Sequence, residues 1–183
     1  MPLIKTFRGD ILRRPEIDSM LVKTNSEMER ALIAMLWIFG KRISEVLRVK
    51  RKDVWIEGDY LMTYFVVLKK ANRVAPLLEK RYLKRIKKTH PYAQIIIDYV
   101  AKIAEPDALL FPISRVKAWR ILKRLNSDVY PHFFRKSLAT AMAEHGATDL
   151  ELMHWFDWDR PATAFRYVQR GTKLTEKWSD REF

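Results

Sequence analysis

Four residues in this 183-residue sequence could together cleave and rejoin a phosphodiester: Arg42, His132, Arg135 and Tyr167. A tyrosine can attack phosphorus, arginine forks bind the non-bridging oxygens, and a histidine can move the proton. A phenolate also leaves easily, so the covalent link could be reversed. Each residue alone has an ordinary interpretation: Arg42 would pair with Glu45 on a solvated helix, and the others would pack or face solvent. Only the occurrence of all four residues in this order along the chain indicates an active site.

The charge of the chain indicates a polyanionic partner. Lys and Arg outnumber Asp and Glu by 35 to 22, for a net charge of +13 and an isoelectric point near 10.0. Nucleic acid is the default partner for such a chain, although ribosomal and membrane-surface proteins have similar charge. Charge alone therefore favours DNA or RNA without saying what is done to it.

Several classes of protein are excluded by composition. A hydrophobic fraction of 48% is too high for a disordered chain, and no apolar run reaches the length of a membrane span. The N-terminus lacks the apolar stretch and cleavage site of a secretory signal, so a cytoplasmic, DNA-associated location is expected. Cysteine is absent, and His90 and His145 have no partners at ligand spacing, so neither a metal nor another cofactor is expected.

The apolar pattern predicts an α+β fold, mostly helical, with a small three-stranded antiparallel sheet that the flanking helices cover. Residues 1–25 are basic and are interpreted as an irregular arm or linker. Residues 58–59 and 70–72 are expected to form the two turns of the sheet. Helices are predicted over 28–39, 43–49, 95–103, 114–125, 131–146, 149–156 and 160–167, and strands over 54–56, 60–68 and 73–77.

Three segments resemble the conserved boxes of the tyrosine recombinases, the phage integrase family. Residues 40–47, Gly-Lys-Arg-Ile-Ser-Glu-Val-Leu, are similar to the first box, in which an arginine is followed by a glutamate on the next turn. Residues 132–137, His-Phe-Phe-Arg-Lys-Ser, resemble the second box. Residues 146–158 resemble the stretch that ends in the nucleophile, with Tyr167 nine positions after Trp158. The resemblance covers residues 26–170, the expected catalytic domain, between the arm at 1–25 and a tail at 171–183.

This resemblance implies a role for each matching residue. Arg42 and Arg135 would hold the scissile phosphate, His132 would assist proton transfer, and Tyr167 would form a 3′-phosphotyrosine link without a metal or an energy cofactor. Glu45 is interpreted as structural, orienting Arg42 or a neighbour. Trp158 stands where the family usually has a second histidine; its indole N–H can donate to phosphate, but it is neither an acid nor a base. More of the proton transfer therefore falls to His132 and a lysine.

The resemblance places that lysine near the second turn of the sheet, where it would protonate the leaving 5′ oxygen. Lys69 and Lys70 both qualify because the turn is shorter than usual, and Lys69 is favoured because it ends the apolar run of the second strand. Basic residues beside this turn are expected to bind the DNA backbone. They are Lys70, Arg73, Arg81, Lys84 and Arg85.

The expected function is that of a site-specific recombinase or integrase, acting on double-stranded DNA at an attachment or crossover site. The family resemblance implies a homo-oligomer, a tetramer, on DNA, with the tail at 171–183 docking on a neighbour. The alternative for that tail is a short helix packed on its own domain. Two other functions stay open: a type IB topoisomerase, and a DNA-binding module that has lost catalysis.

Overall fold

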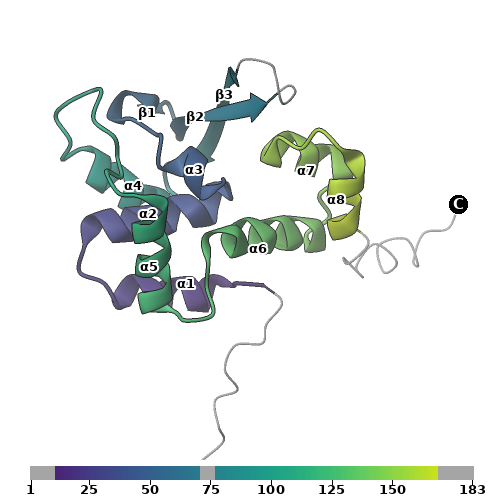
Figure 1. The fold of residues 1–183 in the computed structure, drawn as a ribbon, viewed down its shortest axis with the longest axis horizontal. Helices are drawn as coiled ribbons and strands as arrows, with labels where there is room; N and C mark the ends of the chain where they lie inside the picture. The colour runs from purple at the N-terminus through teal and green to yellow at the C-terminus, as the bar shows by residue number, and fades with distance from the viewer. Residues whose placement is uncertain (1–10, 71–76, 169–183) are drawn as a thin grey trace, which may run out of the picture.

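The computed structural model describes residues 11–70 and 77–168, with the backbone alone at 67–70 and 77–80. The predicted α+β fold, mostly helical with one small antiparallel sheet, is confirmed (Figure 1). The elements, in chain order, are α1 (Arg14–Val22), α2 (Glu27–Phe39), α3 (Ile43–Val46), η1 (Arg51–Asp53), β1 (Val54–Glu57), β2 (Tyr60–Lys70), β3 (Leu77–Lys87), α4 (Pro91–Val100), α5 (Arg115–Leu125), α6 (Pro131–Glu144), α7 (Asp149–Phe156) and α8 (Pro161–Val168).

Helix α2 lies in the middle of the domain because its sequence is apolar on nearly every side. Eight of its thirteen residues are buried, and it packs against α1, α4 and α6. The hydroxyl of Ser26 accepts a hydrogen bond from the backbone N–H of Glu29, as predicted for its N-cap. The helix ends at Gly40, which has a φ of 58° and turns the chain toward Arg42. The buried central helix therefore fixes the position of the segment that carries Arg42.

The interpretation of residues 1–25 as an irregular arm is wrong for residues 14–22, which form α1. Pro15 lies in its first turn, where a missing N–H costs nothing, and Ile17, Met20 and Leu21 are buried against the core. The backbone N–H of Leu12 donates to Ser137 Oγ at 2.7 Å, which ties this segment to α6. The three apolar residues are too few for a strong periodic signal, so the sequence resembled a linker.

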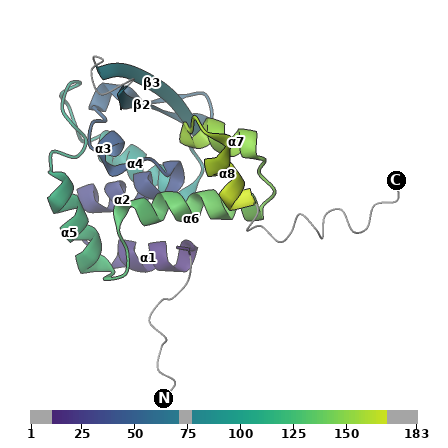
Figure 2. The ribbon, with the colours of Figure 1, turned by 45° about the vertical axis from the view of Figure 1, so that its right-hand side comes forward.

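The sheet has the strand order β1-β2-β3, antiparallel throughout, and lies over the helices (Figures 1 and 2). Leu61, Thr63 and Phe65 of β2 are buried, whereas Tyr64 lies opposite Leu83 of β3 on the other face. The third strand was expected at 73–77, and this placement is wrong because β3 runs from Leu77 to Lys87. Because β3 carries many basic residues, its sequence does not show the alternation of apolar and polar residues that is typical of a strand. Residues 71–76 lie outside the described part of the chain.

Helices α6, α7 and α8 form a second, smaller apolar core. Helix α6 extends from beside α2 to the α7–α8 pair (Figure 2). The buried members of this core are Ala139, Ala143, Leu152, Phe156 and Ala164. Trp158 and Tyr167 pack against it, so the two aromatic residues expected in catalysis are held by α6 through apolar contacts.

Gly40 meets two requirements that alanine cannot meet. Its φ is positive, and a Cβ there would lie 2.7 Å from Phe156 Cε1 and 2.9 Å from Leu138 Cδ2. We expect Gly40→Ala to lower the free energy of unfolding by about 2–4 kcal/mol, combining backbone strain with overpacking. Gly58→Ala is the control, because Gly58 has a φ of 56° with nothing within 4 Å and should lose about 1 kcal/mol. Equal losses in urea unfolding would show that the close packing at Gly40 is unimportant.

Candidate active site

Five of the six predicted catalytic residues line one cleft of about 700 Å³. Arg42 comes from the start of α3, His132 and Arg135 from the first turns of α6, Trp158 from the α7–α8 connection, and Tyr167 from α8. Val66 of β2 also contributes to the wall. Arg48 and Arg160, which the sequence analysis did not single out, line the same cleft. Arg48 follows Glu45 by three residues, as Glu45 follows Arg42, and this repeated spacing is a signal that could have identified it.

Arg42 is held in place by Glu45. The backbone N–H of Arg42 donates to Glu45 Oε2 at 2.9 Å, and Arg42 Nη1 donates to Glu45 Oε1 at 2.7 Å. The glutamate side chain is 6% exposed and that of Arg42 is 47% exposed, so the guanidinium reaches the cleft from a buried anchor. These contacts show the pairing of Glu45 with Arg42 that the sequence led us to expect.

Arg135 is buried and joins three elements. Its Nη1 donates to the carbonyl oxygen of Gly40 at 3.1 Å, and its Nη2 donates to the carbonyl oxygen of Phe156. The guanidinium also lies 5.5 Å from the ring centroid of Trp158. Burial, with the nearby charge of Arg42, lowers the pKa of Arg135 to about 10, so the group stays charged at neutral pH. Two of its five N–H donors are used by these carbonyls, which fixes the plane of the fork beside the cleft.

His132 lies one helical turn before Arg135 and is exposed at the cleft. Partial burial, followed by the positive charges of Arg135 and Arg42, lowers the pKa of His132 below its ordinary value. The imidazole is therefore neutral at pH 7, and one ring nitrogen can accept a proton. This state suits a residue that removes a proton from a nucleophile.

The rate of cleavage should consequently fall as the pH drops through the lowered pKa of His132. Protonation removes the acceptor, whereas between about pH 7 and 8 the imidazole is already neutral and the His132 contribution should be flat. His132→Gln should slow cleavage by roughly 10²-fold and remove this acid limb. Single-turnover rates measured from about pH 5 to 8 test this expectation. An acid limb that persists in His132→Gln would belong to another group.

Tyr167 is placed by an aromatic stack. Its ring lies parallel to that of Trp158, with the centroids 5.2 Å apart and 14° between the planes, and Trp158 in turn stacks on Phe156 at 4.9 Å. Asp157, between the two stacked residues, adopts a left-handed conformation with a φ of 53°, which turns the chain from α7 toward α8. The tyrosine therefore faces the same cleft as the arginines of its own chain.

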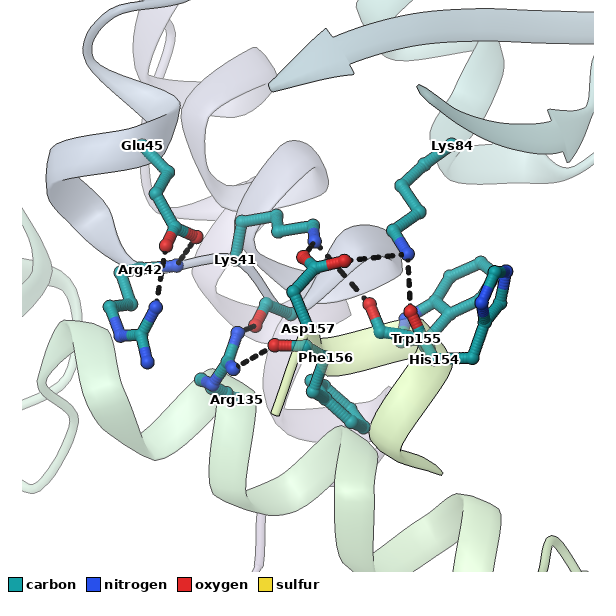
Figure 3. A network of polar contacts seen from close by, with 10 residues as sticks. Lys41, Arg42, Glu45, Lys84, Arg135, His154, Trp155, Phe156 and Asp157 are labelled. Carbon is teal, nitrogen blue, oxygen red and sulfur yellow. Dashed lines mark hydrogen bonds and ion pairs between the residues drawn. The ribbon is translucent and has the colours of Figure 1, made fainter. Parts of the chain in front are cut away.

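Lys84 departs from the expectation of a surface contact with DNA. Its side chain is 5% exposed, its Nζ lies 3.2 Å from Asp157 Oδ1, and it donates to the carbonyl oxygen of His154 at 2.7 Å (Figure 3). Lys41, which the sequence analysis also did not single out, is fully buried and forms an ion pair with the other carboxylate oxygen of Asp157. Because its side chain is buried, Lys84 is not among the exposed residues that could contact phosphate.

The other predicted DNA contacts are placed only in part. Arg81 and Arg85 are exposed on β3, where their guanidinium groups lie 5.5 Å and 5.1 Å from the rings of Tyr64 and Tyr60. Arg81 also pairs with the buried Asp53 at 2.9 Å. Lys69 and Lys70 are the last two residues of β2, but only their backbone is described. Arg73 lies outside the described part of the chain.

Residues 11–70 and 77–168 contain neither a metal-binding cluster nor a membrane span. No group of three or more His, Cys, Asp or Glu side chains in these ranges could hold a metal ion. In the same ranges, no helix has both the length and the apolar character needed to cross a membrane.

Comparison with known proteins relates most of the chain to one family. The model of the phage integrase family matches residues 11–173. A tyrosine recombinase XerD of Staphylococcus saprophyticus is 28% identical over 142 residues, covering 69% of this chain and 45% of the relative. A probable integrase/recombinase of Acholeplasma phage L2 is 26% identical over 154 residues, covering 81% of this chain and 51% of the relative. The chain thus spans about half the length of these curated relatives.

Solved structures share the fold. The XerH site-specific recombinase bound to its difH substrate superposes with a TM-score of 0.68 at 17% identity, over 96% of this chain and 53% of that one. The catalytic domain of bacteriophage HP1 integrase superposes with a TM-score of 0.58 at 14% identity, over 94% of this chain and 98% of that one. Both matches show that the described fold is shared with these proteins.

Proposed function

The chain belongs to the phage integrase family, and we propose that it is the catalytic unit of a site-specific DNA recombinase. The observation that carries this proposal is the cleft that brings Tyr167 together with Arg42 and Arg135. The family match and the recombinase relatives do not favour the type IB topoisomerase alternative. The presence of both arginines and the tyrosine in one cleft also disfavours a module that has lost catalysis.

The proposed reaction has two balanced steps. The oxygen of Tyr167 attacks phosphorus and forms a 3′-phosphotyrosine bond, while the bond from phosphorus to the 5′ oxygen breaks. The phenolic proton passes to neutral His132, and the leaving 5′ oxygen takes a proton from Lys69, with Lys70 as the alternative donor. A 5′-hydroxyl of a partner strand then attacks the phosphotyrosine and gives its proton to the neutral lysine, while the tyrosine oxygen leaves and takes its proton back from His132. This restores the phosphodiester and frees the tyrosine.

Arg42 and Arg135 supply the charge stabilisation in this proposal. Their forks bind the non-bridging oxygens, where negative charge grows in the transition state, and the Trp158 indole donates a further hydrogen bond. We propose that the reaction needs no metal ion. The donor set supports this, because the two buried carboxylates of the cleft, Glu45 and Asp157, are ion-paired with cations of the protein.

The partner in this proposal is double-stranded DNA at a specific site, bound through the strongly basic surface in the cellular compartment that holds the DNA. Arg81 and Arg85, together with Lys70 and Arg73, are proposed to contact the backbone. In this proposal the chain forms a homotetramer on DNA, and residues 171–183 dock on a neighbouring subunit.

The catalytic domain would begin near residue 11 instead of 26, since α1 packs into the core. Tyr167 lines the cleft of its own chain, which supports cleavage in cis.

Covalent capture from a mixed DNA pool tests this function for any target sequence. Duplexes that carry a randomised inverted repeat and a nick in one strand are incubated with the protein, and denaturant-resistant adducts are isolated and sequenced. The proposal predicts recovery of one inverted-repeat sequence cut at a fixed position. Adducts spread over unrelated sequences would favour a topoisomerase, and DNA binding without adducts would favour a silent module.

A further inference from the structure

Three buried charges lie directly behind the cleft. The side chains of Lys41, Asp157 and Lys84, here called the buried triad, are 0%, 4% and 5% exposed. The carboxylate of Asp157 lies between the two ammonium groups, with one oxygen paired to each lysine (Figure 3). The triad keeps one net positive charge in the interior, and Asp157 itself borders the cleft.

The lysines of the triad also bind the end of α7. Lys84 donates to the carbonyl oxygen of His154 at 2.7 Å, and Lys41 donates to the carbonyl oxygen of Trp155 at 3.3 Å. The next carbonyl, that of Phe156, accepts from Arg135. Three consecutive carbonyls at the negative end of this helix are thus bound by three cations from three different segments of the chain (Figure 3).

Two members of the triad, Lys41 and Asp157, are next in the chain to a residue of the proposed chemistry. Lys41 precedes Arg42 in the chain, and Asp157 precedes Trp158, on which Tyr167 stacks. Lys84 lies on β3 and pairs with Asp157, so it links β3 to the segment of Trp158 and Tyr167. The triad therefore joins the segment of the first arginine to the segment of the nucleophile, across residues more than a hundred positions apart.

The ion pairs of the triad are not by themselves evidence of added stability. Removing charges from water is costly, and a buried ion pair replaced by apolar residues of similar volume often leaves a protein equally stable or more stable. The surroundings of Lys41 would accept an apolar side chain, because its Nζ lies 5.6 Å and 5.8 Å from the rings of Phe65 and Tyr82. Burial lowers the pKa of Lys41 to about 8, which shows that its charged form is held against a cost.

We propose that the buried triad positions the two halves of the active site, keeping Arg42 and Arg135 in line with Trp158 and Tyr167. This inference rests on the proposed function, since the alignment matters only for strand cleavage. Residues of the triad act through their neighbours and touch no DNA. The alignment is needed at the transition state, where a displacement of about 1 Å is enough to slow a reaction by about 10²-fold. Loss of the triad should thus slow cleavage more than it weakens DNA binding.

The test compares Lys41→Met, Asp157→Asn and their double variant with wild type on the nicked duplex recovered by covalent capture. Methionine fills the space of the lysine stem, and asparagine tolerates the left-handed backbone of residue 157. Three quantities are measured for each protein: the single-turnover rate of adduct formation, the Kd for the duplex, and the midpoint of thermal unfolding. Lys52→Met is the matched control, because Lys52 pairs with Asp107 at the exposed surface and its loss changes the net charge equally.

Lys41→Met should slow adduct formation by about 10- to 100-fold and change Kd by less than about threefold. The unfolding midpoint should fall by only a few degrees, because the carbonyl of Trp155 loses a donor while Asp157 keeps its ion pair with Lys84. The double variant should be no slower than the slower single variant, because the pair acts as a unit. Lys52→Met should react like wild type. If Lys41→Met does not fold, Lys84→Met tests the other lysine of the triad by the same measurements.

Two results would overturn the inference. One is a folded lysine variant whose rate stays within about twofold of wild type. The other is an equal loss in rate and affinity, which would make the lysine an ordinary phosphate-binding charge. Failure of the proposed function looks different, because wild type itself would then form no adduct on the duplex pool.

Discussion

Replacing Tyr167 with phenylalanine is expected to abolish covalent protein–DNA adducts while leaving the Kd for DNA within about twofold of wild type. The hydroxyl oxygen is the attacking atom in the proposed reaction, and no other atom of the ring can replace it. The stack on Trp158, with centroids 5.2 Å apart, is retained by a phenyl ring, so α8 should keep its position. Adduct yield on a nicked duplex and a mobility-shift titration measure the two quantities.

Tyr99→Phe is the matched control for this change. It also removes one phenolic oxygen, which donates to the carbonyl of Leu110 at 2.6 Å in a part of the chain that does not line the cleft. It should form adducts at the wild-type rate and lose about 1 kcal/mol of stability. Adducts that persist in Tyr167→Phe would assign the nucleophile to another residue.

Replacing Arg135 with lysine is expected to slow adduct formation by on the order of 10²- to 10³-fold, although the charge is retained. The guanidinium binds the carbonyls of Gly40 and Phe156 at once while facing the cleft. A single ammonium has neither the reach nor the planar fork to do this and also bind a phosphate. One of the buried carbonyls would lose its partner, so stability should fall by about 1–3 kcal/mol. Single-turnover kinetics and urea unfolding measure these effects.

Arg124→Lys provides the comparison for this conservative change. Arg124 binds both carboxylate oxygens of Glu29 at 2.6 Å, but its side chain is 57% exposed and lies outside the cleft. Its rate should stay within about twofold of wild type, since exposed ion pairs contribute little. A folded Arg135→Lys that cleaves within about tenfold of wild type would show that charge alone suffices at this position.

The sequence was sufficient to identify five of the residues that line the cleft, although not Arg48 or Arg160. Arg42, His132, Arg135, Trp158 and Tyr167 each lie in a short segment whose local pattern resembles a known box, and such local patterns can be read before the fold is considered. Their meeting in one cleft then follows from the positions of α3, α6 and α8. The same reasoning predicted the mostly helical fold, because most of the helices have clear apolar periodicity.

The buried triad could not be predicted in this way. Lys41 and Asp157 are 116 positions apart, and nothing in the local sequence around either indicates that its partner exists. Lys84 is surrounded by basic residues that face solvent, and only the pleat of β3 distinguishes its inward side chain from Arg85. Charged residues are rarely buried unless they are paired, so the default expectation for both lysines was exposure.

Helix α1 was missed for a related reason. The segment Arg13-Arg14-Pro15 has the composition of a linker, and proline is more often considered a helix breaker than a helix start. Here the proline lies in the first turn, and the three apolar residues that follow complete the core only because α2 and α4 supply the rest of it. Such a short apolar stripe is recognised from its packing partners, which lie far away in the sequence.

Peptide mapping of the adduct tests whether Tyr167 is the nucleophile. After digestion of the DNA and of the protein with trypsin, mass spectrometry identifies the peptide that carries the nucleotide and the end by which it is attached. We expect the peptide of residues 167–170, Tyr-Val-Gln-Arg, modified on Tyr167 through the 3′-phosphate of the cleaved strand. A nucleotide on any other residue, or one joined through a 5′-phosphate, would contradict it.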